Sequence, residues 1–161
     1  MNLPVTVRKM EEGDLNEILT LDTSSSLTPW SRPLFLEEMA HPYGHCFSMI
    51  LHEDPGPKIV AYLCFRTMGD ESELLNLAVH PDYRRRGLAR HLMAFYIDFC
   101  HGEKVKKSFL EVAAGNEAAL HLYRSFDYRP TGKRLRFYLG RFDALMMERE
   151  ILENREKKEQ S

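Results

Sequence analysis

Residues 74–89, LLNLAVHPDYRRRGLA, decide the fold of this chain. The apolar run 74–79 predicts a buried strand, which ends at His80-Pro81. A basic turn follows and leads directly into a helix, whose apolar positions recur at helical spacing at Leu88, Leu92, Phe95, Tyr96 and Phe99. A strand, a basic turn with glycine and a helix start, in this order, predict an anion-binding loop.

The turn at 84–89 has the chemistry that a phosphate group requires. The first N–H groups of a helix, here those of Leu88, Ala89 and Arg90, have no partner within the helix and lie at the positive end of its dipole. Gly87 permits a close approach of the backbone to an anion. Positive charge comes from Arg84, Arg85 and Arg86. A solvated basic turn between a core strand and an amphipathic helix is the alternative.

The loop resembles a known family rather than the commoner nucleotide-binding signatures. The sequence contains neither GxxxxGK[ST] nor GxGxxG. Its pattern Arg84-x-x-Gly87-x-Ala89 resembles the [Q/R]-x-x-G-x-[G/A] loop of the Gcn5-related N-acetyltransferases (GNAT). The resemblance implies that residues 84–90 hold the pyrophosphate of acetyl-coenzyme A, the acetyl donor.

The second half of the chain extends this resemblance. The segment 108–114, SFLEVAA, predicts a strand, and Asn116 is a favoured N-cap for the helix 116–126. The apolar face of that helix comprises Ala119, Leu122, Tyr123 and Phe126. The segment resembles the family's closing motif, L-E-V-x-x-x-N-x-x-A-x-x-L-Y-x-x-x-G-F. Asp127 and Tyr128 depart from its final Gly-Phe, and Asp127 is expected to adopt a left-handed conformation.

The resemblance also implies which residues carry the chemistry. It implies that Glu111 acts as the general base and that Tyr123 acts as the acid beside the departing thiolate, close to the coenzyme. It gives Asn116 a coenzyme contact in addition to its cap. Backbone groups of the strand before the loop are implied to bind the coenzyme and stabilise the oxyanion: Leu77, Ala78 and Val79.

The residues alone leave both catalytic assignments open. Strand alternation places Glu111 on one face with Phe109 and Ala113, an apolar setting that would disfavour a charged carboxylate. The alternative for Glu111 is an ion pair with a nearby arginine. The alternative for Tyr123 is a core tyrosine on an amphipathic helix.

The resemblance implies an amine as the acceptor, and finer likenesses bear on which amine it is. The segments 28–31 (TPWS), 110–112 (LEV) and 122–123 (LY) resemble those of enzymes that acetylate the N-terminal alanine of a ribosomal protein. The segment 134–147 matches their ending only loosely. Acetylation of lysine side chains or small amines is a second hypothesis. A non-catalytic acetyl-coenzyme A sensor is a third, against which the presence of both Glu111 and Tyr123 counts.

The periodicity predicts one α/β domain over residues 1–150 and a charged tail over 151–161. The sheet is expected to be mixed and mostly antiparallel, with about seven strands and helices on both faces. The first helix is expected to begin at Asp14, which forms a capping box with Glu17, and the second at Ser31, with Leu34, Phe35 and Met39 inward. Strands are predicted at 5–10, 45–51, 58–68, 72–79, 107–114, 129–138 and 142–150, and a third helix at 88–101.

Composition restricts the remaining possibilities. A net charge of −2 argues against general nucleic-acid binding. Most of the basic residues between 124 and 141 suit a solvated hairpin surface, and contact with coenzyme phosphates or docking of a partner is the alternative. Three widely spaced cysteines and the lack of a signal peptide or membrane-spanning run predict a cytoplasmic protein. The spacing of the seven histidines does not favour a metal site. The oligomeric state is not predicted.

Overall fold

The computed structural model describes residues 3–151. Its strands are β1 (Val5–Lys9), β2 (Gly44–Leu51), β3 (Lys58–Met68), β4 (Glu71–Val79), β5 (Lys107–Ala113), β6 (Arg129–Tyr138) and β7 (Phe142–Glu150). Its α-helices are α1 (Leu15–Ser25), α2 (Arg32–Ala40), α3 (Leu88–Gly102) and α4 (Glu117–Ser125), and the 3-10 helices are η1 (Glu12–Asp14) and η2 (Pro81–Tyr83). The predicted elements are all present, with ends that differ by one or two residues.

The strands form one sheet in the order β1-β2-β3-β4-β5-β7-β6. β4 and β5 pair in parallel, with Glu71 opposite Lys107 and Leu74 opposite Leu110. The pairs β1–β2, β2–β3, β5–β7 and β6–β7 are antiparallel. The predicted mixed and mostly antiparallel sheet of seven strands is therefore confirmed.

Two compact units make up the chain. The first comprises Met1–Arg66 and Leu75–Leu92, and the second comprises Thr67–Leu74 and Met93–Ser161. Strand β4 and helix α3 each contribute residues to both units. The single domain expected over residues 1–150 stays a prediction.

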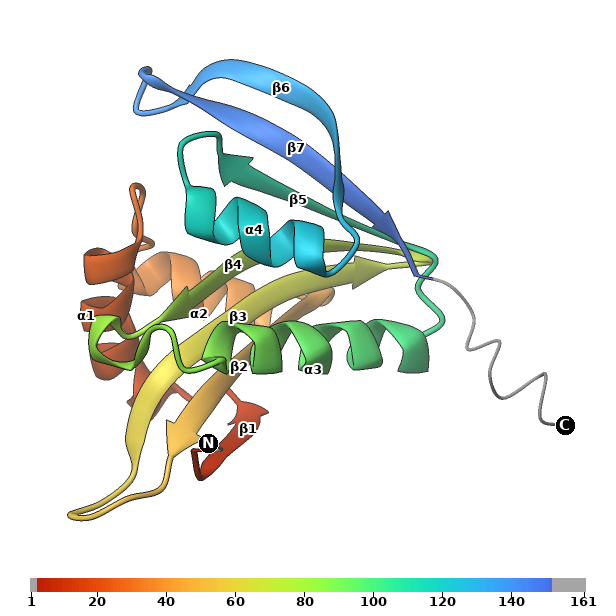
Figure 1. Cartoon of the computed structure of the whole chain (residues 1–161). Coiled ribbons are helices and arrows are strands. Elements are labelled where there is room, and N and C mark those ends of the chain that lie inside the picture. The colour runs from red at the N-terminus through yellow and green to blue at the C-terminus, as the bar shows by residue number, and fades with distance from the viewer. Residues whose placement is uncertain (1–2, 152–161) are drawn as a thin grey trace, which may run out of the picture. The chain divides into compact units, whose positions relative to one another are not determined.

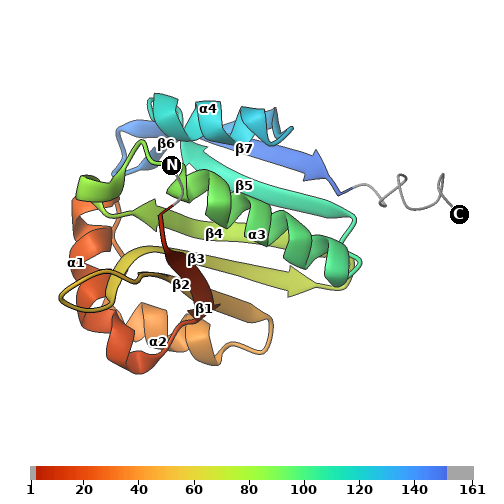
Figure 2. The ribbon, with the colours of Figure 1, turned by 60° about the horizontal axis from the view of Figure 1, so that its bottom comes forward.

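In the first unit, α1 and α2 lie next to each other beside β1–β3 (Figure 2). Phe35 of α2 contacts the rings of Trp30 and Tyr62, with centroids 5.2 and 5.4 Å away. The carboxylate of Asp22 is fully buried, and it accepts hydrogen bonds from the backbone N–H of Trp30 (2.7 Å) and from the Tyr62 hydroxyl (2.5 Å). Because a buried charge requires such partners, Asp22 anchors the connection between α1 and α2 to the core.

In the second unit, β6 and β7 form a long hairpin next to β5 (Figure 1). A chain of buried hydroxyls lies between α3 and the strands. The Tyr96 hydroxyl bonds to Ser72 (2.7 Å) and Ser108 (2.8 Å), and Ser108 bonds in turn to the Tyr128 hydroxyl (2.7 Å). Tyrosine is thus tolerated at position 128, where the family motif has phenylalanine, because Ser108 supplies the partner that a buried hydroxyl needs.

The start of α1 differs from the prediction. The Asp14 carboxylate does not cap the helix: it binds the Arg8 guanidinium (2.7 and 2.8 Å), the Ser48 hydroxyl (2.9 Å) and the N–H of Glu11 (2.9 Å). Glu17 instead accepts the N–H of Ile59 (3.0 Å). The predicted capping box of Asp14 with Glu17 is therefore wrong, because Arg8, Glu11 and Ser48 engage the Asp14 carboxylate and the Ile59 N–H engages that of Glu17.

Other local predictions have mixed outcomes. Ser31 caps α2 by accepting the Leu34 N–H, as predicted, but Leu34 is 47% exposed and does not belong to the core. Asp127 adopts the expected left-handed conformation, with φ of 66°. From residue 152 on, the predicted charged tail lies outside the described residues, whereas Ile151 is buried and its N–H donates to the Lys106 carbonyl (2.8 Å).

Candidate active site

The loop between β4 and α3 has the backbone geometry of an anion site. Gly87 has φ of +78°, and nothing lies within 4 Å of the position that a Cβ would occupy there. The first hydrogen bond of α3 runs from the His91 N–H to the Gly87 carbonyl (3.0 Å). The N–H groups of Leu88 and Ala89 precede that bond and have no partner within the helix. The space over Gly87 is open, so a phosphate can approach these groups.

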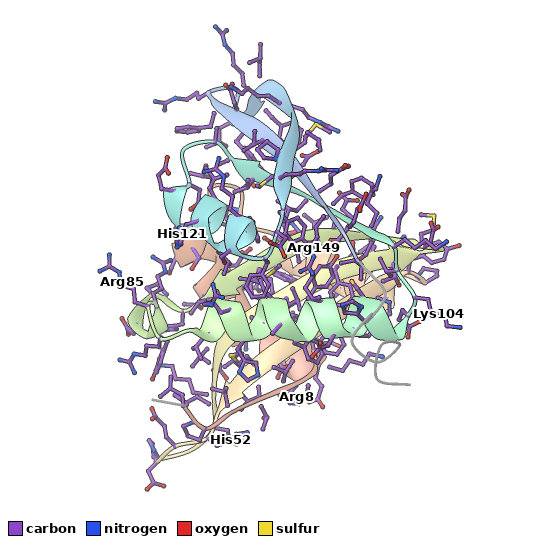
Figure 3. The ribbon with its side chains drawn as sticks, turned by 45° about the vertical axis from the view of Figure 1, so that its right-hand side comes forward. Arg8, His52, Arg85, Lys104, His121 and Arg149 are labelled. Carbon is purple, nitrogen blue, oxygen red and sulfur yellow. The ribbon has the colours of Figure 1, made fainter. Side chains whose placement is uncertain are left out.

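The three arginines of this loop differ in their contacts. Arg84 donates to the Ser25 hydroxyl (3.1 Å), and the Arg86 guanidinium lies 5.3 Å from the centre of the Tyr83 ring. Arg85 has φ of 62° and extends outward from the loop (Figure 3). Within residues 3–151, no salt bridge involves any of these three arginines. No carboxylate among residues 3–151 therefore neutralises their positive charge.

The end of β4 is held by two hydrogen bonds on opposite sides. The His80 N–H donates to the Val60 carbonyl of β3 (2.7 Å), while the Val79 carbonyl accepts from the Ser25 hydroxyl (3.3 Å). Because the N–H and C=O of an extended residue point to the same side, the Val79 N–H faces away from β3. Along the strand, Leu77 has the same orientation as Val79, and Ala78 the opposite one. Leu77 and Val79 are therefore better placed than Ala78 to donate to a ligand beside β4.

In the second unit, α4 begins as predicted. The side chain of Asn116 accepts the Ala119 N–H (3.2 Å) and caps the helix. Leu120 and Tyr123 are the buried residues of α4, and Leu120 was missed from the apolar face that the sequence predicted. Arg149 of β7 lies near the end of this helix and donates to the Phe126 carbonyl (3.1 Å; Figure 3).

Tyr123 lies in an apolar environment. Its ring packs edge-on against Tyr128, with centroids 6.0 Å apart. Burial, with a smaller contribution from Tyr138, raises the pKa of Tyr123 to about 12. The phenol is therefore protonated at neutral pH, which a proton donor requires.

Glu111 is less buried than the sequence suggested. Its side chain is 26% exposed and forms a salt bridge of 3.2 Å with Arg134 of β6. Glu111 shares a face with Phe109 and Ala113, as expected, but its setting is not apolar, because Arg134 and solvent also reach it. The arginine partner that the sequence left as an alternative is present. Such a pair does not exclude a role as base, because a partly exposed ion pair exchanges readily.

Tyr138, at the end of β6, was not among the predicted site residues. Burial raises the pKa of its phenol, and the nearby charge of Glu111 adds to the effect. Tyr138 also contributes to the raised pKa of Tyr123. It therefore lies within electrostatic range of both predicted catalytic groups. No sequence signal places it there, because β6 reaches this position through irregular pairing between Arg134 and Tyr138.

The predicted site residues are divided between the two units. The first unit contains the residues predicted to bind the coenzyme through β4 and the loop, from Leu77 to Arg90. The second unit contains Glu111, Asn116 and Tyr123. In the part of the chain that the structure describes, no helix has the length and apolar character needed to span a membrane.

Comparisons with known proteins give the family and the relatives of this chain. Residues 14–128 match the Acetyltransferase (GNAT) family. The chain is 31% identical to the ribosomal protein bS18-alanine N-acetyltransferase of Escherichia coli K12, over 88% of this chain and 95% of that enzyme. It is also 31% identical to N-alpha-acetyltransferase RimI of Mycobacterium tuberculosis, over 91% and 93%.

Solved structures show the same fold. The crystal structure of the Escherichia coli ribosomal-protein-S18-alanine N-acetyltransferase superposes with a TM-score of 0.81 at 31% identity, covering 91% of this chain and 94% of that one. Arabidopsis thaliana NAA60 in complex with acetyl-CoA also gives a TM-score of 0.81, at 18% identity and with 91% and 98% covered. At that lower identity the likeness concerns the fold alone.

Proposed function

Since this chain belongs to the Acetyltransferase (GNAT) family and is an acetyl-CoA-dependent N-acetyltransferase, we propose that its acceptor is the N-terminal α-amino group of a protein. One observation carries the proposal: relatives at 31% identity, matched over nearly their whole length, are N-terminal acetyltransferases by name. A ribosomal protein that begins with alanine is the acceptor this likeness favours. A cytoplasmic location stays a prediction.

In this proposal the coenzyme phosphates bind at the start of α3. The N–H groups of Leu88 and Ala89 and the charge of Arg84–Arg86 receive the pyrophosphate, and the open space over Gly87 accommodates it. The backbone of Leu77 and Val79 is directed to the side where an extended arm of the donor can add to the edge of β4. Asn116 both caps α4 and contacts the coenzyme.

The proposed chemistry uses one carboxylate and one phenol. The acceptor arrives as an ammonium ion and must lose a proton before its nitrogen attacks the thioester carbonyl. Glu111 accepts that proton, directly or through a water molecule. As the tetrahedral intermediate collapses, its C–S bond breaks, the nitrogen loses its second proton to water, and Tyr123 donates its proton to the departing thiolate. A proton from water then restores the Tyr123 phenol. The Tyr123 phenol is protonated at neutral pH, as a proton donor must be, and its raised pKa makes it a weaker acid than an exposed tyrosine.

The function is tested with matched peptides and mass spectrometry. One set has a free N-terminal alanine and no lysine, and the other has the same sequences blocked at the N-terminus with one internal lysine. The proposal expects acetylation of the free α-amino group at a rate that clearly exceeds that of the lysine peptides. Because the α-amino pKa lies roughly two units below that of lysine, one carboxylate can deprotonate it more easily. Faster acetylation of the blocked lysine peptides would overturn the N-terminal assignment.

A further inference from the structure

The guanidinium groups of the loop before α3 are held in different ways. Arg84 donates to the Ser25 hydroxyl at the end of α1 (3.1 Å). The Arg86 guanidinium lies over the Tyr83 ring, 5.3 Å from its centre. Within residues 3–151, Arg85 makes no hydrogen bond, salt bridge or contact with an aromatic ring. Its guanidinium is therefore the group of this loop that has no partner in the described part of the chain.

The backbone of Arg85 adds to the significance of this free side chain. Its φ of 62° lies in the left-handed region, where a Cβ crowds the backbone. Glycine adopts such a φ without that cost, as Gly87 does two residues later. Arginine at position 85 therefore has a conformational cost that glycine would avoid, and no contact of its side chain within residues 3–151 offsets it. A contact with a ligand can offset it.

The side chain of Arg85 is directed outward. Arg84, directly before it, has an extended backbone, with φ of −68° and ψ of 159°. The change from an extended to a left-handed residue turns the chain, and the Arg85 side chain projects from this turn away from the protein (Figure 3). An anionic molecule that is bound at the start of α3 and continues past the loop therefore meets the Arg85 guanidinium.

Acetyl-coenzyme A has an anionic group at such a place. Besides its pyrophosphate it carries a phosphate monoester on the 3′-oxygen of the ribose, which has a charge of about −1.5 to −2 at pH 7 and presents several acceptor oxygens. The ribose is attached directly to the pyrophosphate, on the side away from the thioester. The planar fork of a guanidinium matches the geometry of a phosphate monoester.

We propose that Arg85 binds the 3′-phosphate of acetyl-coenzyme A and makes the enzyme prefer this donor over the same donor without that phosphate. This inference rests on the proposed coenzyme site at the start of α3 and is independent of the acceptor. The guanidinium donates to the monoester oxygens, while the N–H groups of Leu88 and Ala89 receive the pyrophosphate. The contact strengthens binding of the donor without accelerating the chemical step, because the ribose phosphate is remote from the thioester.

The test compares acetyl-coenzyme A with acetyl-dephospho-coenzyme A, which lacks only the 3′-phosphate. Calorimetry on the full-length protein gives the Kd of each donor. The wild type is expected to bind acetyl-coenzyme A about threefold to thirtyfold more tightly, the range that charge-assisted hydrogen bonds at an exposed site provide. This ratio should shrink in high salt, since salt screens exposed charges. In acetylation assays the two donors should differ in KM and not in kcat.

Two variants at position 85 separate the guanidinium from the backbone. Arg85→Gln removes the charge and keeps a side chain at the left-handed position, whereas Arg85→Gly also relieves the strain. Both are expected to bring the ratio of the two dissociation constants close to one. Arg86→Gln is the matched control, because it removes one charge from the next residue, whose guanidinium lies over Tyr83. This control is expected to weaken both donors alike and to keep the ratio.

The outcomes distinguish this inference from the proposed function. A wild-type protein that binds both donors equally tightly contradicts the inference and leaves the proposed function standing. So does a preference that persists in both Arg85→Gln and Arg85→Gly. If Arg86→Gln abolishes the preference as fully as Arg85→Gln, the loop recognises the 3′-phosphate through its total charge, and the specific role of Arg85 is wrong. If the wild type binds neither donor, the proposed function itself fails, and the inference falls with it.

Discussion

The arginines of the loop before α3 and those of the β6–β7 hairpin have opposite surroundings. Among the described residues, no carboxylate of the chain pairs with Arg84, Arg85 or Arg86. In the hairpin, Arg134 pairs with Glu111, and Arg129 lies 3.9 Å from Glu148. The positive charge of the loop is therefore available to an external anion, whereas carboxylates of the protein neutralise part of the charge of the hairpin.

The two regions also differ in the groups that they present: the loop presents backbone N–H groups, and the hairpin presents side chains. The loop offers N–H groups at Leu88 and Ala89 that any sequence with this backbone retains, so it suits a donor common to the whole family. At the hairpin, the salt bridge joins the side chains of Glu111 from β5 and Arg134 from β6, which meet across β7. Such a site changes with single substitutions. Members of one fold can therefore share acetyl-coenzyme A and differ in their acceptors.

The largest expected effect tests the loop. Gly87→Asp places a carboxylate beside the N–H groups of Leu88 and Ala89, at a residue with φ of +78°. Coenzyme binding, measured by calorimetry, is expected to fall by more than about 100-fold, since charge repulsion adds to the strain of a left-handed residue. Gly87→Ala meets no neighbouring atom, so it isolates the strain and should weaken binding less. Equal affinity in the Asp variant would remove the loop from the binding site.

The next effect tests the proposed base. Glu111→Gln keeps the shape of the side chain but cannot take a proton. Turnover near neutral pH is expected to fall by about 100-fold or more, with partial recovery at alkaline pH, where the amine is already neutral. Coenzyme affinity should change little, which calorimetry can check.

A matched variant distinguishes the base from its ion pair. Arg134→Gln breaks the same salt bridge as Glu111→Gln but retains the carboxylate. Its turnover with an uncharged acceptor peptide should therefore fall less, and it should not show the alkaline recovery. If the two variants have the same pH profile, Glu111 acts only through its pair with Arg134.

A smaller loss is expected for the proposed acid. Tyr123→Phe retains the ring that packs against Tyr128 and removes the proton donor. Turnover should fall at least about tenfold, which allows for a loss below the roughly 100-fold that is the lower end of the usual range for a general acid. Stability and coenzyme binding should be nearly unchanged. Undiminished turnover would leave Tyr123 as a core residue of α4.

The sequence predicted the loop side more completely than the hairpin side. The loop depends on local chemistry, a strand end, Gly87 and a helix start, and all of these are contiguous in the chain. The salt bridge of Glu111 depends on a partner 23 residues away, across a third strand and beyond a bulge near Gly132. Periodicity gives the face of each strand but not its register with a non-adjacent strand.

The same limit explains the errors at the first helix. Asp14 and Glu17 have the spacing of a capping box, but Arg8, Ser48 and the Ile59 N–H compete for their carboxylates. Burial alone would raise the pKa of Asp14, and the bonds from Arg8, Glu11 and Ser48 together outweigh it and lower the pKa. Tertiary partners of this strength override a local cap. A sequence pattern cannot show them, because β1, β2 and β3 meet the start of α1 only in the fold.

The smallest effect is expected at Tyr128, beside the proposed acid but outside the proposed chemistry. Tyr128→Phe restores the residue that the family motif contains and removes one buried hydrogen bond to Ser108, which keeps its bond to Tyr96. The variant should lose about 1 kcal/mol of unfolding free energy at neutral pH, the usual value of such a bond. Its turnover should stay within about twofold of the wild type, far less than the loss of roughly 100-fold or more that is typical for a general acid.

Alkaline unfolding sharpens this last comparison. Burial holds the pKa of Tyr128 above its ordinary value of 10.0, so the folded protein keeps the phenol neutral where the unfolded chain ionises it. Stability from this group is therefore complete below pH 10.0 and is lost as the pH rises above it, by up to about 1.4 kcal/mol per pH unit. Denaturant titrations between neutral pH and about pH 11 should show a shallower loss for Tyr128→Phe than for the wild type. An identical pH dependence of the two proteins would mean that the Tyr128 hydroxyl is accessible to water. A large loss of turnover in Tyr128→Phe would instead extend the catalytic machinery from Tyr123 to the hydrogen-bonded hydroxyls of Tyr128, Ser108 and Tyr96.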